Sequence, residues 1–313
     1  MALGCALWLL APGPGARAAQ IRADQQPAPG RMRVRVDLVG VVASVLDPDG
    51  KPVPNLPREA FEVYEDGRRQ RIDVFQRQTN LPLDLALMID TSLSTLTEMK
   101  FEREAASHFI HEVLRPGDRL SVFQFALNVT QLSSFSGDSS VLDDGLRRLH
   151  SGTGTSLFDA ILLGSRAIGE RPADHRRVIL LVTDAGETTS HGTYEAARDA
   201  AVRAGAMLYT ILIRPVKSES GRNTAGEHAV DTIIDMTGGG LYTVDSPDQF
   251  TPTFDRINQE LRTEYMLGYY PDPPPPAGAY RQIDVRLNPP GPAAGARYFV
   301  RYRKGYYAPE SNP

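Results

Sequence analysis

Cysteine is almost absent from this chain of 313 residues, in which Cys5 is the single example. It lies in MALGCALWLLAPGPGARAAQ, an apolar run followed by Ala16-Arg17-Ala18, a small-x-small cleavage pattern. We therefore expect residues 1–18 to be an export signal cut near Ala18, so that the protein is periplasmic, secreted or cell-surface. A lipoprotein anchor at Cys5 is the weaker alternative, because the apolar run continues past it. The mature chain would contain no cysteine and would fold outside the cytoplasm without disulfides.

An excess of basic residues and a long hydrophobic run are also absent. The chain has 34 Lys and Arg against 38 Asp and Glu, a formal net charge of −4, which argues against nucleic-acid binding. The N-terminal apolar run is too short to span a bilayer and no later run is longer, so we expect no transmembrane segment. An apolar fraction of 41% can support a core, and the length suits two ordinary domains or one large one.

The signatures of common enzyme classes are missing too. The sequence has no G-x-S-x-G elbow, no P-loop and no G-x-G-x-x-G after a strand. His108 and His111 could share one face of a helix, but HFIHE is not the H-E-x-x-H zinc-protease pattern and zinc would need further ligands. We therefore predict that the protein is not an enzyme.

Both ends of the predicted mature chain have β character. After a flexible leader at 19–31, residues 32–38 alternate apolar and polar side chains with a period of two, and Asp66-Gly67 joins two predicted strands in FEVYEDGRRQRIDVF. We therefore predict that residues 32–78 form an all-β segment. Residues 264–308 again contain strand patterns, around the proline-rich turn PDPPPPAG. Each β segment alone is small, so we predict that they pair into one β-sandwich-like domain. Two separate small β modules are the alternative.

The middle of the chain, 81–263, alternates apolar strands with helical patterns. The strands are predicted at 83–90, 119–126, 176–184, 206–213 and 240–244. The helical patterns cover 97–114, 140–150, 157–170, 193–204, 224–237 and 247–263. This alternation predicts an α/β fold, a doubly wound and mostly parallel sheet with helices on both faces. The fold would be inserted in, or flanked by, the β-sandwich-like domain.

Polar side chains gather where two of these strands end. Asp90 closes the strand LDLALMID, and Asp184 closes RRVILLVTD. If these strands are neighbours, both carboxylates lie at the carboxyl edge of the sheet, where doubly wound folds bind ligands. Ser92 and Ser94 follow Asp90, and Thr155 lies in a glycine-containing loop before a helix. The sequence thus places two carboxylates and three hydroxyls as candidate ligands at one edge.

All these candidate ligands offer oxygen atoms. Hard divalent cations take oxygen ligands and often keep waters, so we expect Mg²⁺, with Mn²⁺ or Ca²⁺ as alternatives. The set does not close a coordination sphere if the carboxylates bind through water. One position could then accept an outside ligand, most naturally a carboxylate from a partner protein.

The pattern resembles the metal-ion-dependent adhesion site (MIDAS) of von Willebrand factor type A (VWA) domains, which reads D-x-S-x-S, then a threonine, then an aspartate on a later strand. It is carried here by Asp90, Ser92, Ser94, Thr155 and Asp184. The resemblance implies that the three hydroxyls bind the ion directly and that the two carboxylates bind directly or through water. It covers the middle of the chain, about residues 81–263, and implies a Rossmann-like VWA fold.

The flanking segments are similar to a VWFA-related family described from Acidobacteria, whose members resemble exported proteins with the A domain between β segments. The stretches that carry this likeness are DPDGKPVPNLPREAFEVYEDGRRQRI and YMLGYYPD, YRQIDVRL and RYRKGYYAP. One departure is Ala185, where many relatives have glycine; it is not a ligand position. Two roles stay open for each nearby residue: Asp159 as a support of the ligands or a solvated helix residue, and Glu187 and Thr188 as partner-selecting or plain loop residues.

These inferences favour an exported, non-enzymatic adhesion module that binds a divalent cation and engages an acidic residue of a protein partner. Two alternatives remain. An open metal could activate water in a metal-assisted hydrolase. The chain could also be a scaffold protein that binds through its β domain.

Overall fold

The computed structural model describes residues 38–77, 81–93, 95, 99–214, 224–288 and 297–310. The predicted export signal, the leader, residues 32–37 of the first predicted strand and the candidate ligand Ser94 lie outside the described residues. Within the described ranges, none of the helices has the length and apolar character needed to cross a membrane.

One sheet of six strands forms the centre of the α/β part, in the order β10-β9-β8-β5-β6-β7. Its strands are β5 (Leu83–Asp90), β6 (Arg119–Phe125), β7 (Val129–Gln131), β8 (Arg176–Thr183), β9 (Met207–Ile213) and β10 (Leu241–Val244). All neighbours run parallel except β7, which pairs antiparallel with β6. The mostly parallel sheet is as predicted, whereas β7 was not, because a three-residue strand carries no readable periodicity.

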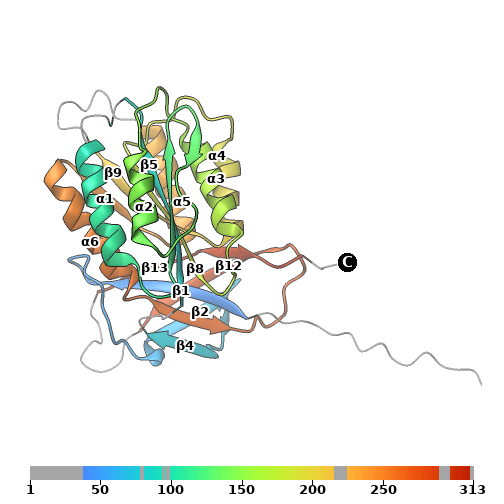
Figure 1. The fold of residues 1–313 in the computed structure, drawn as a ribbon. Coiled ribbons are helices and arrows are strands. Elements are labelled where there is room, and N and C mark those ends of the chain that lie inside the picture. The colour runs from blue at the N-terminus through green and yellow to red at the C-terminus, as the bar shows by residue number, and fades with distance from the viewer. Residues whose placement is uncertain are drawn as a thin grey trace, which may run out of the picture. The chain divides into compact units, whose positions relative to one another are not determined.

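Helices cover both faces of this sheet (Figure 1). They are α1 (Met99–Val113), α2 (Ser139–Arg147), α3 (Leu157–Gly169), α4 (Tyr194–Ala204), α5 (Thr224–Thr237) and α6 (Phe250–Leu261), which follows the short helix η3 (Pro247–Gln249). Alternate residues of β5 enter different cores. Leu87 packs in the core that holds α1, α2 and α6, and Met88 packs in the core that holds α3, α4 and α5. This arrangement confirms the predicted α/β fold with helices on both faces.

The remaining strands form two four-stranded sheets, ordered β13-β1-β11-β4 and β14-β12-β2-β3. Their bounds are β1 (Val39–Leu46), β2 (Phe61–Glu65), β3 (Arg68–Gln70), β4 (Val74–Arg77), β11 (Tyr265–Tyr269), β12 (Tyr280–Leu287), β13 (Phe299–Tyr302) and β14 (Gly305–Tyr307), with a short helix η1 (Arg58–Ala60). Each sheet combines strands from before and after the α/β part, and one shared core includes Val41, Phe61 and Tyr265. The two β segments therefore form one sandwich.

Two predicted strands are each divided between the sheets. After the turn at Asp66 (φ 46°) and Gly67 (φ 78°), the chain forms β3 in one sheet and then β4 in the other. Residues 71–73 make the crossing, where the Asp73 N–H donates to the Gly268 carbonyl at 2.7 Å. The C-terminal run likewise splits into β13 and β14. Alternation along the sequence reports which residues are buried, but it cannot report which sheet supplies the hydrogen bonds.

Three consecutive glycines lie where α5 leads into β10 and meets the sandwich. A Cβ on Gly239 would overlap the carbonyl of Leu208 in β9, and a Cβ on Gly238 (φ 82°) would overlap the backbone of Tyr302 in β13. The Lys304 N–H also donates to the Met236 carbonyl at 2.9 Å. Glycine is required here because backbone approaches backbone without room for a side chain.

Candidate metal centre

Asp90 is the last residue of β5, which lies between β6 and β8 in the sheet, and its side chain has no exposed surface. One carboxylate oxygen, Oδ1, accepts the Ser92 N–H at 2.9 Å, and the other, Oδ2, accepts the Thr183 hydroxyl at 2.6 Å. The first hydrogen bond closes a tight turn through the aspartate side chain. The second joins β5 to the end of β8. Both bonds fix the carboxylate at the carboxyl edge of the sheet.

The charge of Asp90 is weakly compensated. Burial raises the pKa of its carboxyl to about 6, against the lowering effect of hydrogen bonds from Thr183 and Ser92, and the charge of Asp184 raises it further. Among the described residues, no lysine, arginine or histidine forms an ion pair with Asp90 or Asp184. Two neighbouring carboxylates without a cationic side chain favour a bound cation.

Ser92 lies in a compact loop after β5 and is almost completely buried. It forms a parallel bridge with Gly152, whose N–H donates to the Thr91 carbonyl at 2.9 Å. The hydroxyl of Thr95 closes the same loop by donating to the carbonyl of Asp90 at 2.9 Å. These contacts bring the loop that carries Ser92 against the loop that leads to Thr155.

Thr155 is held by the loop that follows Asp184. Its N–H donates to the Thr188 hydroxyl at 2.8 Å, and its carbonyl accepts the N–H groups of Thr188 at 2.9 Å and Thr189 at 3.2 Å. A Cβ placed on Gly186 would lie 3.0 Å from Asp184 Oδ1 and 3.4 Å from Thr155 Oγ1. The oxygens of Thr155 and Asp184 therefore border the same space beside Gly186.

The structure thus brings Asp90, Ser92, Thr155 and Asp184 together at one edge of the sheet, whereas Ser94 lies outside the described residues. The donor set of carboxylates and hydroxyls suits a hard divalent cation. Sequence reasoning missed the supporting roles of Thr183, Gly186 and Thr188. The one available signal was the clustering of hydroxyl residues around Asp184 in VTDAGETTS.

Asp159 and Glu187 brace the loops around this site. Asp159 accepts the N–H groups of His191 at 3.0 Å and Gly192 at 2.8 Å, and these bonds hold its pKa below the usual range although partial burial opposes them. Glu187 accepts the N–H of Phe158 in the first turn of α3 at 3.1 Å. Asp159 is therefore not simply a solvated helix residue, and the Glu187 carboxylate is engaged with a helix N-terminus.

Ala185 adopts a left-handed backbone conformation, with φ 58°, and is fully buried. This conformation costs a residue with a Cβ about 1–2 kcal/mol relative to its ordinary conformations. It explains why glycine suits this position. The strain lies directly beside the candidate ligand Asp184.

The two histidines of α1 have acidic neighbours on other helices. His111 Nε2 lies 2.9 Å from Asp143 in α2, and His108 Nε2 lies 3.5 Å from Asp255 in α6. In the part of the chain that the structure describes, no group of three or more His, Cys, Asp and Glu side chains is placed to hold a metal. The candidate centre is not such a group, because it has only two carboxylates and its other proposed ligands are hydroxyl groups.

A family model described as "von Willebrand factor type A domain" matches residues 85–187. This segment is a VWA domain. VWA domains often mediate protein interactions and metal-dependent binding. The matched residues begin in β5 and end beyond Asp184, so they include every candidate ligand.

Several solved structures resemble this chain at low sequence identity. A von Willebrand factor type A protein from Catenulispora acidiphila is 12% identical, covers 88% of this chain and 74% of its own, and has a TM-score of 0.51, which supports the VWA fold. BatB, a conserved hypothetical protein from Bacteroides thetaiotaomicron, is 18% identical over 58% of this chain and 100% of its own, with a TM-score of 0.45.

A third structure is proximal thread matrix protein 1 from the mussel byssus with a zinc-occupied MIDAS motif. It is 13% identical over 58% of this chain and 48% of its own, with a TM-score of 0.48. No curated protein sequence is significantly similar to the chain.

Proposed function

We propose that the protein is an exported adhesion module whose VWA domain binds a divalent cation and uses it to engage an acidic residue of a protein partner. The proposed ligands are Asp90, Ser92, Ser94, Thr155 and Asp184. Mg²⁺ is the proposed ion, with Mn²⁺ and Ca²⁺ as alternatives. A bound ion would supply positive charge for an incoming carboxylate.

The observation that carries this proposal is the buried carboxylate of Asp90. This carboxylate accepts hydrogen bonds from a hydroxyl and an amide, but among the described residues no cationic side chain forms an ion pair with it. The charge of Asp184 raises its pKa further. A fully buried carboxylate with a second one nearby is costly unless a positive charge compensates it. A cation bound at this edge of the sheet provides that compensation.

The surroundings of the centre support a protein partner. Leu93 and Leu127 are 60% and 47% exposed, in loops that follow the adjacent strands β5 and β6. The carbonyl of Leu127 accepts the hydroxyl of Ser156 at 2.8 Å, so this loop is fixed to the neighbour of Thr155. Exposed apolar side chains beside a charged centre allow a partner to combine a carboxylate contact with apolar burial.

The proposal is tested by titrating Mg²⁺ and Mn²⁺ calorimetrically into the chelator-stripped chain starting at Ala19. We expect saturable binding to one site that Asp90→Ala abolishes. The matched control is Asp144→Ala, because Asp144 is an exposed carboxylate on α2 with a side chain 64% exposed. Circular dichroism and thermal unfolding should show that both variants remain folded.

An acidic peptide added to the same titration tests the second part of the proposal. We expect metal to strengthen peptide binding in wild type and to have no effect on peptide binding in Asp90→Ala. Peptide binding that is equal in wild type and Asp90→Ala, and that metal does not strengthen, would contradict the proposal and favour a scaffold that binds through the sandwich. Metal-dependent turnover of an ester or phosphoester panel, lost in Asp90→Ala, would instead indicate a hydrolase.

A further inference from the structure

The sandwich has an open edge where its two sheets end in β3 and β4. Each of these strands is the last in its sheet, and residues 71–73 pass from one to the other. A pocket of about 600 Å³ opens at this crossing. The opposite edge strands, β13 and β14, contact α5 and α4 of the VWA domain. The pocket therefore lies at the edge of the sandwich that does not hold these contacts.

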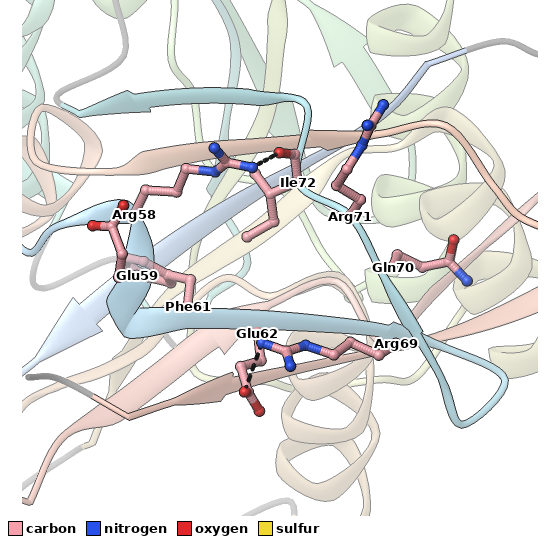
Figure 2. Close-up of a pocket in the computed structure, with 8 residues that line it drawn as sticks. All are labelled: Arg58, Glu59, Phe61, Glu62, Arg69, Gln70, Arg71 and Ile72. Carbon is pink, nitrogen blue, oxygen red and sulfur yellow. Dashed lines mark hydrogen bonds and ion pairs between the residues drawn. The ribbon is translucent and has the colours of Figure 1, made fainter.

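The pocket has an apolar base and charged walls. Phe61 and Ile72 belong to the sandwich core and are 3% and 6% exposed, yet both line the pocket. Three arginines, Arg58, Arg69 and Arg71, line it together with the two glutamates Glu59 and Glu62. Figure 2 shows Arg58 reaching across from η1 to the backbone of Ile72, and Arg69 directed toward β2.

The guanidinium groups keep donors available for a ligand. Arg69 pairs with Glu62 at 2.9 Å, and Arg71 pairs with Asp73 at 2.6 Å, with 65% and 82% of the arginine side chains exposed. Such exposed pairs contribute little and can be exchanged for another carboxylate. Each guanidinium has five N–H donors in a planar fork, so it can hold its neighbour and an added oxygen together.

We propose that this pocket is a second binding site, independent of the metal centre, for an extended acidic peptide. A peptide carboxylate would bind between Arg58, Arg69 and Arg71, and an adjacent apolar side chain would cover Phe61 and Ile72. The edge strands β3 and β4 favour a peptide over a free anion, because edge strands present backbone donors and acceptors to an added strand. A free anion could use the arginines but not the apolar base.

The test uses fluorescence anisotropy with the full chain in excess chelator, which removes any contribution from the metal centre. The probe is a labelled hexapeptide, Ser-Leu-Glu-Leu-Asp-Ser, and its counterpart has Gln and Asn at the acidic positions. We expect the acidic peptide to bind and the amide peptide to bind at least about tenfold more weakly, because charge-assisted hydrogen bonds are lost. Inorganic phosphate and acetate are titrated as competitors.

Arg58→Gln and Arg71→Gln should each weaken the acidic peptide by about tenfold. The matched control is Arg68→Gln, because Arg68 is an exposed arginine of the same hairpin that does not line the pocket. Its affinity should stay within about twofold of wild type. Thermal unfolding of each variant checks that the hairpin is intact.

Three outcomes would overturn the inference. The first two are no binding of the acidic peptide in the presence of chelator, and an equal loss of affinity in Arg68→Gln, which would indicate nonspecific charge attraction. The third is displacement of the labelled peptide by phosphate at concentrations at which acetate and unlabelled peptide do not displace it. This result would identify an anion site and overturn the peptide assignment. Because the assay contains chelator, failure here leaves the metal-dependent function untouched, and failure of metal binding leaves this site untouched.

Discussion

Arg176, the first residue of β8, forms an ion pair of 2.8 Å with Glu264, and both side chains are almost completely buried. Glu264 directly precedes β11, the first strand of the C-terminal β segment, and also accepts the Tyr209 hydroxyl at 3.3 Å. Arg176 donates in addition to the Leu261 carbonyl at the end of α6. This pair therefore links the six-stranded sheet to the point where the chain returns to the sandwich.

The Arg176–Glu264 pair predicts a pH-dependent stability. Burial raises the pKa of Glu264 to about 7 from an ordinary 4.5, although Arg176 acts in the opposite direction. The folded state then binds this proton more tightly than the unfolded state, so the free energy of unfolding should fall as pH rises from about 4.5 to about 7. Glu264→Gln should flatten this slope, because glutamine does not titrate.

Urea unfolding at several pH values measures the slope for wild type and Glu264→Gln. Asp90 also has a raised pKa, near 6, but it is present in both proteins, so the difference between the two slopes isolates Glu264. Parallel slopes across the interval would show that Glu264 does not titrate there.

Gly239→Ala should be strongly destabilising. Its methyl group would overlap the Leu208 carbonyl, which is backbone of β9 and cannot rotate away. We expect a loss of about 3 kcal/mol in the free energy of unfolding, at the upper end for overpacking. Gly169→Ala is the control, since its Cβ would meet Ala204 at an ordinary 3.6 Å and alanine favours the helix. A Gly239→Ala protein as stable as this control would contradict the described packing.

Gly186→Ala should weaken metal binding without unfolding the domain. The added Cβ would lie 3.0 Å from Asp184 Oδ1 and 3.4 Å from Thr155 Oγ1, so Asp184 Oδ1 must shift by a few tenths of an ångström. We expect the dissociation constant for Mg²⁺ to rise about tenfold or more, as for other changes that reorient ligands. Calorimetric titration measures the affinity, and a melting temperature near that of wild type separates the effect from misfolding. Unchanged affinity would place the ion away from Gly186.

Thr188 should act by positioning Thr155. Thr188→Val removes the hydroxyl that accepts the Thr155 N–H at 2.8 Å, whereas Thr188→Ser keeps it. We expect the valine variant to bind Mg²⁺ about tenfold more weakly and the serine variant to bind like wild type. A purely structural role would lower the melting temperature without this contrast in affinity. Equal affinity in all three proteins would remove Thr188 from the centre.

The α/β fold could be predicted because its strands are buried on both faces. Apolar runs such as LALMI in LDLALMID are typical of strands buried on both faces, and they recur between amphipathic helices. The helix predicted at 224–237 matches α5 at both ends. The division of the last predicted strand into β13 and β14 could not be predicted. Hydrogen-bond partners in a sandwich are set by residues far away in sequence, and the alternation of side chains is the same in either sheet.

Some features of the candidate centre could likewise be predicted from the sequence, and others could not. The order of Asp90, Ser92, Thr155 and Asp184 is readable in the sequence, because each oxygen-bearing residue ends or follows a strand or precedes a helix. The sequence by itself therefore determined which donors are present and at which edge of the sheet they stand. That Ser94 is a ligand remains a prediction.

Only the tertiary structure decided how those donors are held. The Thr183 hydroxyl on Asp90, the Thr188 hydroxyl on Thr155 and the space beside Gly186 all join loops that are distant in sequence. The same holds for the pocket at the edge of the sandwich, which exists because β3 and β4 belong to different sheets. The local sequence determines the secondary-structure propensity and the functional groups of each segment. Packing between distant segments determines the distances between these groups and their burial, which in turn determine their charge and the ligands that they can bind.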